Sequence, residues 1–173
     1  GMFCLFCSFG TEWVRRCFKL KIYELAKEVN PYVVEMRRYF HEHPELSFEE
    51  YQTAAYIRES LSKMGVAIAD GFSGTSTVGV LKGSEPGPCI AFRADIDALP
   101  VEEDNDLPYK SKIPGVMHAC GHDAHTAYLM VLADILLEKK DQLKGKIVII
   151  HQHAEEAPPG GAKQMIEAGV LEG

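Results

Sequence analysis

The chain has 173 residues, of which 46% are hydrophobic and 25% charged, so it is long enough to bury one ordinary globular core. Its formal net charge of -7 argues against nucleic-acid binding, which needs clustered lysine and arginine. No stretch of the sequence is apolar for long enough to span a bilayer. We therefore expect a globular protein that binds neither nucleic acid nor membrane.

The five cysteines are odd in number and irregularly spaced. This pattern does not resemble a disulfide framework, so it favours a reducing cytoplasm. Cys4 and Cys7 form a C-x-x-C pair that could bind zinc or take part in redox chemistry. No second pair of cysteines or histidines accompanies it, so we favour neither role.

The first part of the chain fits poorly with the rest. Gly1 before Met2 resembles the remnant of a purification tag, and we leave it out of the fold argument. Residues 2–9 are apolar but too few for a membrane helix, and no basic region precedes them. We predict an N-terminal extension of unassigned role over 1–29 and a catalytic-type domain over 30–173.

Two helices are predicted at the start of this domain. Asn30 followed by Pro31 is typical of an N-cap and a first helical position, and Pro44 predicts where the helix ends. Residues 47–50 read SFEE, which predicts a capping box and a second helix. Gly65 is expected to end that helix.

Four segments have β character. Residues 75–81 and 89–93 are joined by the turn-rich residues 83–88, which predicts a hairpin. Residues 66–68 predict a short strand. Residues 147–150 read IVII, a continuous apolar run typical of a buried central strand.

The remaining elements complete an alternating pattern. Residues 127–137 carry a broad apolar helical face, and residues 162–168 predict a short helix. The acidic, proline-punctuated loop over 100–115 is long enough to suggest a functional segment. This alternation predicts an α/β fold with a mixed, largely buried central sheet flanked by helices.

Two segments carry the chemistry. Residues 118–125 read HACGHDAH and open a helix, whereas residues 151–156 read HQHAEE and follow the apolar strand. Soft and hard donors at the ends of regular elements are what a catalytic divalent-metal site requires. In α/β sheets such groups collect at the carboxyl ends of strands, where Asp95 and Asp97 are also expected.

Each candidate also has an ordinary interpretation. The glutamate pair alone would be a solvated loop, the histidines loop or cap residues, and Cys120 a buried small hydrophobe. Their joint occurrence favours the metal site. A nucleophilic Cys120 assisted by a neighbouring histidine is the alternative, but it leaves the glutamates without a role. Because adjacent side chains on an extended segment point in opposite directions, we expect Glu155 and Glu156 to perform different tasks.

Three segments resemble the amidohydrolase branch of the aminoacylase-type metallopeptidases, which includes hippurate hydrolases, N-acetyl-amino-acid deacetylases and auxin-conjugate hydrolases. They are residues 93–100 (RADIDALP), 118–125 and 154–156 (AEE), and residues 40–46 (FHEHPEL) resemble the branch's N-terminal signature. The resemblance implies part of the catalytic domain of a zinc-peptidase-like α/β fold. It also implies metal-dependent hydrolysis of the amide bond in N-acyl amino acids or short peptides.

The resemblance implies roles residue by residue. Cys120, His122 and Glu156 match the metal ligands, and Glu155 matches the general base. Asp97 matches the carboxylate that in related branches orients a metal ligand. A complete site in this branch holds two divalent ions, for which zinc, manganese, nickel and cobalt all suit the donors.

The sequence departs from the family in two ways. His151 and His153 stand where family members commonly have an aromatic residue and a proline. They could be extra ligands, donors that orient a ligand, or subfamily variation, and we favour the last.

Family members are also longer. Their later half supplies two further metal-ligand histidines, groups that grip the substrate's carboxylate, and a dimerisation domain. The chain is therefore expected to carry half of a site and to have little or no activity alone. The alternative is a non-catalytic remnant that self-associates through an exposed sheet edge.

Overall fold

The computed structural model describes the backbone of residues 6–172 and the side chains from Tyr23 onward. The chain divides into two compact units, of which the first ends at Tyr32 and the second begins at Val33. Within the described residues, no helix is both long enough and apolar enough to cross a membrane. The predicted tag remnant and the C-x-x-C pair lie outside the residues whose side chains are described.

Helix α1 (Phe6–Glu42) begins well before Asn30, so the predicted N-cap and helix start are wrong. Pro31 lies inside the helix, where its missing N–H and its ring cost about 3 kcal/mol relative to alanine. Residues 24–28 read ELAKE and are all strong helix formers, and this local preference continues the helix across the proline. The helix ends just before Pro44, as predicted.

Helix α2 (Tyr51–Met64) begins later than the capping box predicts, and no side chain at its N-cap position bonds to it. Instead, the Glu45 carboxylate accepts two backbone N–H groups of the first turn at 3.1 and 2.7 Å. The Ser47 hydroxyl donates to the Asp97 carboxylate at 2.6 Å, so a tertiary contact takes it away from the helix. The helix ends at Gly65 in a left-handed conformation (φ 98°), as predicted.

The sheet has four strands, which are β1 (Ala67–Ala69), β2 (Thr77–Lys82), β3 (Glu85–Asp95) and β4 (Lys144–Gln152). Their order is β1-β2-β4-β3, with β3 parallel to β4 and the other pairs antiparallel. The predicted mixed sheet is confirmed, but the hairpin between β2 and β3 is wrong because β4 lies between them. The apolar run of β4 thus lies in an inner strand of the sheet, between two strands that are neighbours in sequence.

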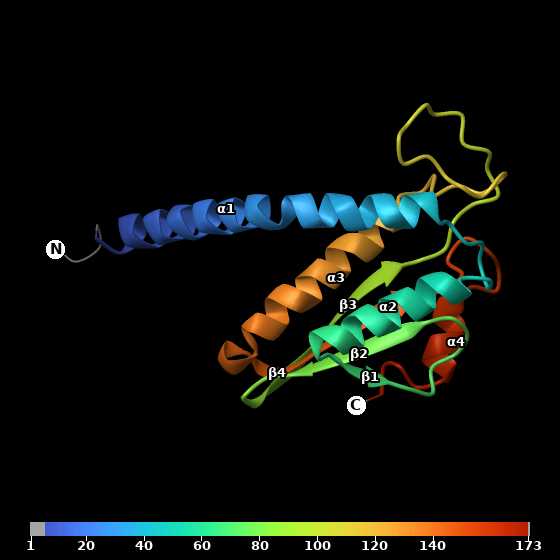
Figure 1. Ribbon diagram of the computed structural model, residues 1–173. Helices are drawn as coiled ribbons and strands as arrows, with labels where there is room; N and C mark the ends of the chain where they lie inside the picture. Colours follow the sequence, from blue (N-terminus) through green and yellow to red (C-terminus); the bar gives the residue numbers. More distant parts are fainter. Residues whose placement is uncertain (1–5, 173) are drawn as a thin grey trace. The chain divides into compact units, whose positions relative to one another are not determined.

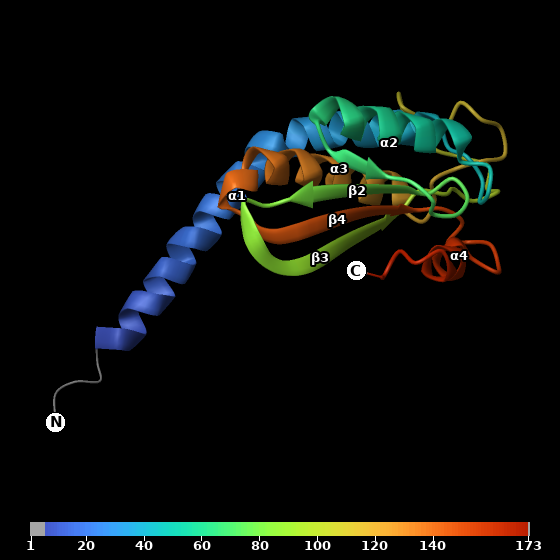
Figure 2. The same cartoon turned by 90° about the horizontal axis from the view of Figure 1, so that it is seen from below.

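Helices lie on both sides of the sheet, two long ones on one side and one short one on the other. Figures 1 and 2 show α2 and α3 (His122–Glu138) over one face and α4 (Gly161–Glu167) against the other. A 3-10 turn at Lys140–Gln142 connects α3 to β4. Along β4, Ile149 is fully buried toward α2, whereas Ile150 packs with residues of β2 and α4 on the opposite face. The α/β class and the two predicted later helices are confirmed.

Strand β3 is exposed along most of its length, so the sheet is less buried than predicted. Ile90 and Phe92 are 47% and 37% exposed. Burial begins only at Ala94, near the end of the strand. Among the described residues β3 pairs with β4 alone and is an edge strand.

Candidate metal centre

The predicted site residues gather at one end of the sheet. Strands β3 and β4 run parallel, with Asp95 opposite Gln152, so the segments that follow them leave the same edge. Helix α3 begins at this edge with His122, after Gly121 in a left-handed conformation (φ 96°). All five residues predicted for the site therefore lie in three neighbouring segments.

Cys120, His122 and Glu156 form the first donor set. One sulfur, one ring nitrogen and one carboxylate oxygen of these residues all lie within 4.8 Å of one another. Zinc binds such donors at about 2.0–2.3 Å, so ligands of one ion are separated by roughly 3–4 Å. A small inward movement of these side chains would let them hold one divalent ion, and the exposed Cys120 leaves it accessible.

Asp97 orients both the imidazole and the glutamate segment. The Nδ1 of His122 lies 2.9 Å from the Asp97 carbonyl oxygen and 3.3 Å from its Oδ1. This contact places the proton on Nδ1 and leaves Nε2 free for a metal ion. The Oδ2 of Asp97 accepts the backbone N–H of Glu156 at 2.9 Å, in addition to the Ser47 hydroxyl.

These contacts set the charges of the site. Burial alone would raise the pKa of Asp97, but hydrogen bonds, above all from His122, hold that pKa well below its usual range. Burial alone would lower the pKa of His122, but Asp97 raises it to about 9. A hydrogen bond with Glu156 raises the pKa of the Cys120 thiol to about 11. The raised pKa values of Cys120 and His122 reflect the carboxylates close to them, and a divalent cation would stabilise this negative charge.

Both glutamate side chains approach the same imidazole nitrogen. His122 Nε2 lies 4.0 Å from an oxygen of Glu155 and 3.9 Å from an oxygen of Glu156. The predicted opposite directions are therefore wrong. Strand β4 ends at Gln152, and Ala154 adopts a left-handed conformation (φ 48°) that ends the extended alternation.

Known proteins match most of the chain. Residues 91–173 match the model of the peptidase family M20/M25/M40. An N-acyl-L-amino acid amidohydrolase of Geobacillus stearothermophilus is 46% identical over 155 residues, which are 90% of this chain and 42% of that protein. Thermostable carboxypeptidase 1 of Saccharolobus solfataricus is 50% identical over 150 residues, which are 86% of this chain and 38% of that protein.

A solved structure shares both fold and sequence with the chain. The crystal structure of Bacillus subtilis YXEP, described as a dinuclear metal-binding peptidase of the M20 family, matches with a TM-score of 0.80 and 47% identity. The match covers 85% of this chain and 41% of that one. The chain belongs to the M20 peptidase family, in its amidohydrolase branch. It spans about two fifths of the length of these relatives. The predicted family is confirmed, and so is the fold as part of an M20 catalytic domain.

A second donor set in this M20 chain shares His122 with the first. Donor atoms of Asp95, His122 and His125 also lie within 4.8 Å of one another. The Arg93 guanidinium already donates to Asp95 Oδ1, at 3.0 and 2.6 Å. No role for His125 is predicted from the sequence, although its position one helical turn after His122 places both rings on one face of α3.

The other histidines near the M20 site are buried. His118 is 4% exposed, its ring nitrogens have no hydrogen-bond partner among the described residues, and burial lowers its pKa to about 4. His151 is fully buried, which lowers its pKa to about 3. His153 Nε2 lies 3.1 Å from Gln164 Oε1. Neither His151 nor His153 joins a donor cluster within the described range, so we continue to favour subfamily variation.

A buried charge network lies beneath the first turn of α3. The Asp123 carboxylate contacts Arg37 Nε and His41 Nδ1, both at 2.7 Å. The other ring nitrogen of His41 lies 3.0 Å from Glu103 in the acidic loop. Each nitrogen of the His41 ring therefore faces a carboxylate from another segment. The network ties the end of α1 and the acidic loop to the residue next to His122.

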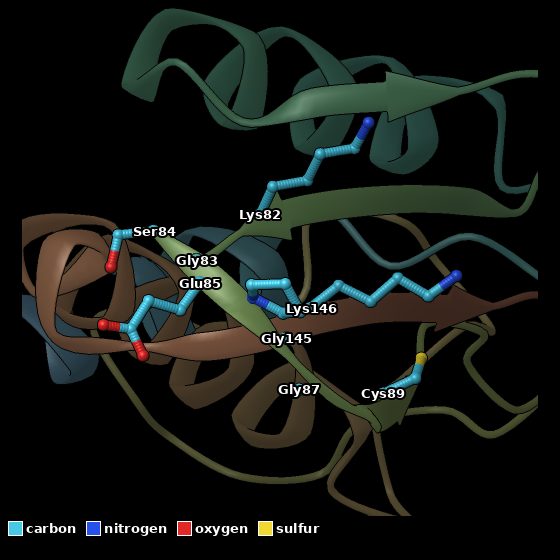
Figure 3. A pocket seen from close by; sticks show the side chains of 9 residues that line it. Lys82, Gly83, Ser84, Glu85, Gly87, Cys89, Gly145 and Lys146 are labelled. Atoms are coloured by element: carbon cyan, nitrogen blue, oxygen red, sulfur yellow. The ribbon is translucent and has the colours of Figure 1, made fainter.

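The hollow shown in Figure 3 lies away from these donors. It has a volume of about 540 Å³ and is lined by the turn at 83–87 and by residues where β3 and β4 begin. Lys82, Cys89 and Lys146 contribute side chains to it. The donors lie where these parallel strands end, so the hollow and the donor clusters are at opposite ends of β3 and β4.

Proposed function

We propose that this M20 chain carries part of a metal-dependent amidohydrolase site that hydrolyses N-acyl amino acids or short peptides. The convergence of Cys120, His122 and Glu156 within 4.8 Å, beside the Glu155 carboxylate, carries the proposal. The similarity to the N-acyl-L-amino acid amidohydrolase of Geobacillus stearothermophilus supports the substrate class.

The residues would divide the work as follows. Cys120, His122 and Glu156 would hold a divalent ion, which when bound would polarise the amide carbonyl and lower the pKa of water. The Glu155 carboxylate would accept a proton from the attacking water and return it to the leaving amine. Asp97 would keep the proton of His122 on Nδ1 through the contact at its carbonyl oxygen.

We propose two divalent ions for the complete site, as zinc, manganese, nickel or cobalt. Thiolate, imidazole and carboxylate donors admit all four metals. The Asp95–His122–His125 set offers harder donors than the Cys120 set. The described cysteines Cys89 and Cys120 are both free thiols, which supports our proposal of a reducing cytoplasm.

Replacement of Glu155 by glutamine tests the proposed reaction. We expect at most weak release of free amino acid from N-acetyl amino acids by the metal-loaded chain, and we expect Glu155→Gln to slow this release by about 10²–10⁴-fold because the proton acceptor is lost. Cobalt binding should change little, since Glu155 is not in the proposed ligand set. Glu167→Gln, in an exposed ion pair, is the matched control. Equal rates for wild type and Glu155→Gln would refute the assignment, and no release by the wild type would refute independent activity.

A nucleophilic Cys120 finds less support. The pKa of its thiol is raised to about 11, mainly by Glu156, so the nucleophilic thiolate is scarce at neutral pH. His122 Nδ1 is committed to Asp97, and Nε2 faces the glutamates. This arrangement favours a cation over a catalytic thiol.

Self-association through β3 is the second candidate function, because this long edge strand exposes Ile90 and Phe92. We expect light scattering to detect dimers or larger species whose population falls when Phe92→Lys places a charge on the edge. Val101→Lys, at an exposed apolar residue outside the strand, should leave the distribution unchanged. A wild type that is monomeric at all concentrations would rule out this candidate.

A further inference from the structure

Glu50 is a buried carboxylate with no role in the proposed reaction. Its side chain is 0% exposed. It accepts a hydrogen bond from the Thr75 hydroxyl on one oxygen and from the backbone N–H of Ala154, at 2.8 Å, on the other. Within the described residues no lysine or arginine pairs with it. Burying a carboxylate in this way is costly, so its two contacts require an explanation.

The contact with Ala154 occurs at an unusual backbone conformation. Ala154 has φ 48°, in the left-handed region that disfavours residues with a Cβ. Its N–H is held by Glu50, and its carbonyl oxygen accepts the N–H of Gly161 at 2.9 Å. The residue is 0% exposed, so water cannot replace either contact. The two hydrogen bonds therefore fix a conformation that alanine alone would leave.

This conformation determines where the following glutamates point. Ala154 lies between the last residue of β4 and the Glu155–Glu156 pair, and both carboxylates end within 4.0 Å of His122 Nε2. The Asp97 carboxylate holds the N–H of Glu156 on the other side. Two buried carboxylates from distant parts of the chain thus hold backbone N–H groups at either end of this short turn.

We propose that Glu50 is a positioning residue that holds Ala154 in its left-handed conformation and thereby aims Glu155 and Glu156 at the metal centre. The inference rests on the proposed function for the importance of these glutamates. It predicts that the effect of Glu50 passes through the conformation of Ala154, and not through the general stability of α2.

Cobalt titration and amide hydrogen exchange of Glu50 and Ala154 variants test this proposal. Glu50→Ala should weaken cobalt binding by about 10–100-fold, the usual cost of losing a residue that orients ligands. It should also speed exchange in residues 153–157. Glu50→Gln should bind within about threefold of wild type, because its carbonyl oxygen can accept the Ala154 N–H while its NH₂ faces Thr75. This rescue separates a hydrogen-bonding role from a charge effect.

A double-mutant cycle tests whether the effect passes through Ala154. Glycine adopts left-handed conformations freely, so Ala154→Gly should bind cobalt like wild type, and Glu50→Ala should cost less in its background. Glu45→Ala is the matched control, because the Glu45 carboxylate also accepts backbone N–H groups but only in the first turn of α2. It should lower the melting temperature and leave cobalt affinity unchanged.

The outcomes distinguish this inference from the proposed function. Wild-type affinity in Glu50→Ala, an equal loss in Glu45→Ala, or additive effects of the Glu50 and Ala154 changes would each overturn the positioning role. A wild type that binds no cobalt would refute the proposed metal centre, and exchange in residues 153–157 would then decide the role of Glu50. If Glu50→Ala does not fold, Glu50→Gln decides: near-wild-type binding and exchange support the role, and a tenfold loss refutes it.

Discussion

Replacing His122 with alanine is expected to weaken divalent-metal binding by at least about 100-fold, because loss of a ligand should exceed the 10–100-fold cost of losing a residue that orients one. Both donor sets within the described residues use this imidazole, so neither survives the change. Cys120→Ser removes a donor from only one set and should cost less. Cobalt titration followed by visible absorbance would measure both effects.

The cobalt titration has two controls, a substitution of another histidine and the absorbance band of the cobalt–thiolate bond. His43 lies in an exposed contact with the Tyr39 carbonyl oxygen, so His43→Ala should bind cobalt like wild type. The thiolate-to-cobalt charge-transfer band should vanish in Cys120→Ser even where binding remains. Wild-type affinity in His122→Ala would contradict the proposed centre. Equal losses in both variants would instead show that the Asp95–His122–His125 set holds no ion without Cys120.

The donor cluster was predictable because its parts follow simple topological rules. Residues after parallel strands leave the same edge of the sheet, and His122 begins the helix that packs on that sheet. The apolar run at 147–150 predicted an inner strand for a different reason. A strand that is buried on both faces of the sheet has no solvent-exposed side and can be apolar throughout. Asp97 lies beside Glu156 because the strands that precede these two residues, β3 and β4, are neighbours and run parallel.

The errors arose where long-range contacts override local signals. Ser47 and Glu50 have the spacing of a capping box, but one bonds to Asp97 and the other to Ala154. Strands β2 and β3 are joined by a turn typical of a hairpin, but β4 lies between them. A local sequence pattern indicates which hydrogen bonds a side chain can form with its neighbours in sequence. It does not indicate which distant residue will bind that side chain instead. Ser47 and Glu50, which support the site, therefore could not be recognised from the sequence, where they form an ordinary helix-capping pattern.

The His122 imidazole and the backbone of the glutamate segment are oriented by buried groups from other parts of the chain. His122, Glu156 and Ala154 are each held by hydrogen bonds to buried groups from other segments. Ligands that are oriented in advance lose little conformational freedom on binding, which favours affinity. The Cys120 thiol is the exception, because it is exposed and bonds only to Glu156 among the groups of the site.

Asp97→Asn is expected to destabilise the metal-free protein by about 3 kcal/mol at pH 6, because removing one partner leaves a buried charge unpaired. The His122 pKa is about 9 in the folded chain and ordinarily 6.5. The stability from protonated His122 is therefore fully present below pH 6.5 and lost as the pH rises through 9. The Asp97 pKa is lowered, so its contribution is present above its ordinary value of 3.8 and lost at lower pH.

Urea unfolding with a chelator present, at several pH values, would measure this dependence. The free energy of unfolding of the wild type should be highest between about pH 4 and 6.5 and fall by about 2 kcal/mol toward pH 9, allowing for partial solvent screening. Asp97→Asn should flatten that fall, because His122 loses the partner that raises its pKa. Asp70→Asn, in an exposed pair with Arg58, is the control and should change stability by less than about 1 kcal/mol.

Metal binding should show the opposite pH dependence. A metal ion binds only deprotonated His122 and Cys120, so binding releases protons and cobalt affinity should rise with pH over the range in which the metal-free protein loses stability. The free energy of unfolding of the metal-free protein should therefore fall with pH while the cobalt affinity rises. Measuring both quantities tests whether the Asp97–His122 pair governs both. If the fall in stability toward pH 9 persists unchanged in Asp97→Asn, another group causes it, and the pair does not set the charge of the centre.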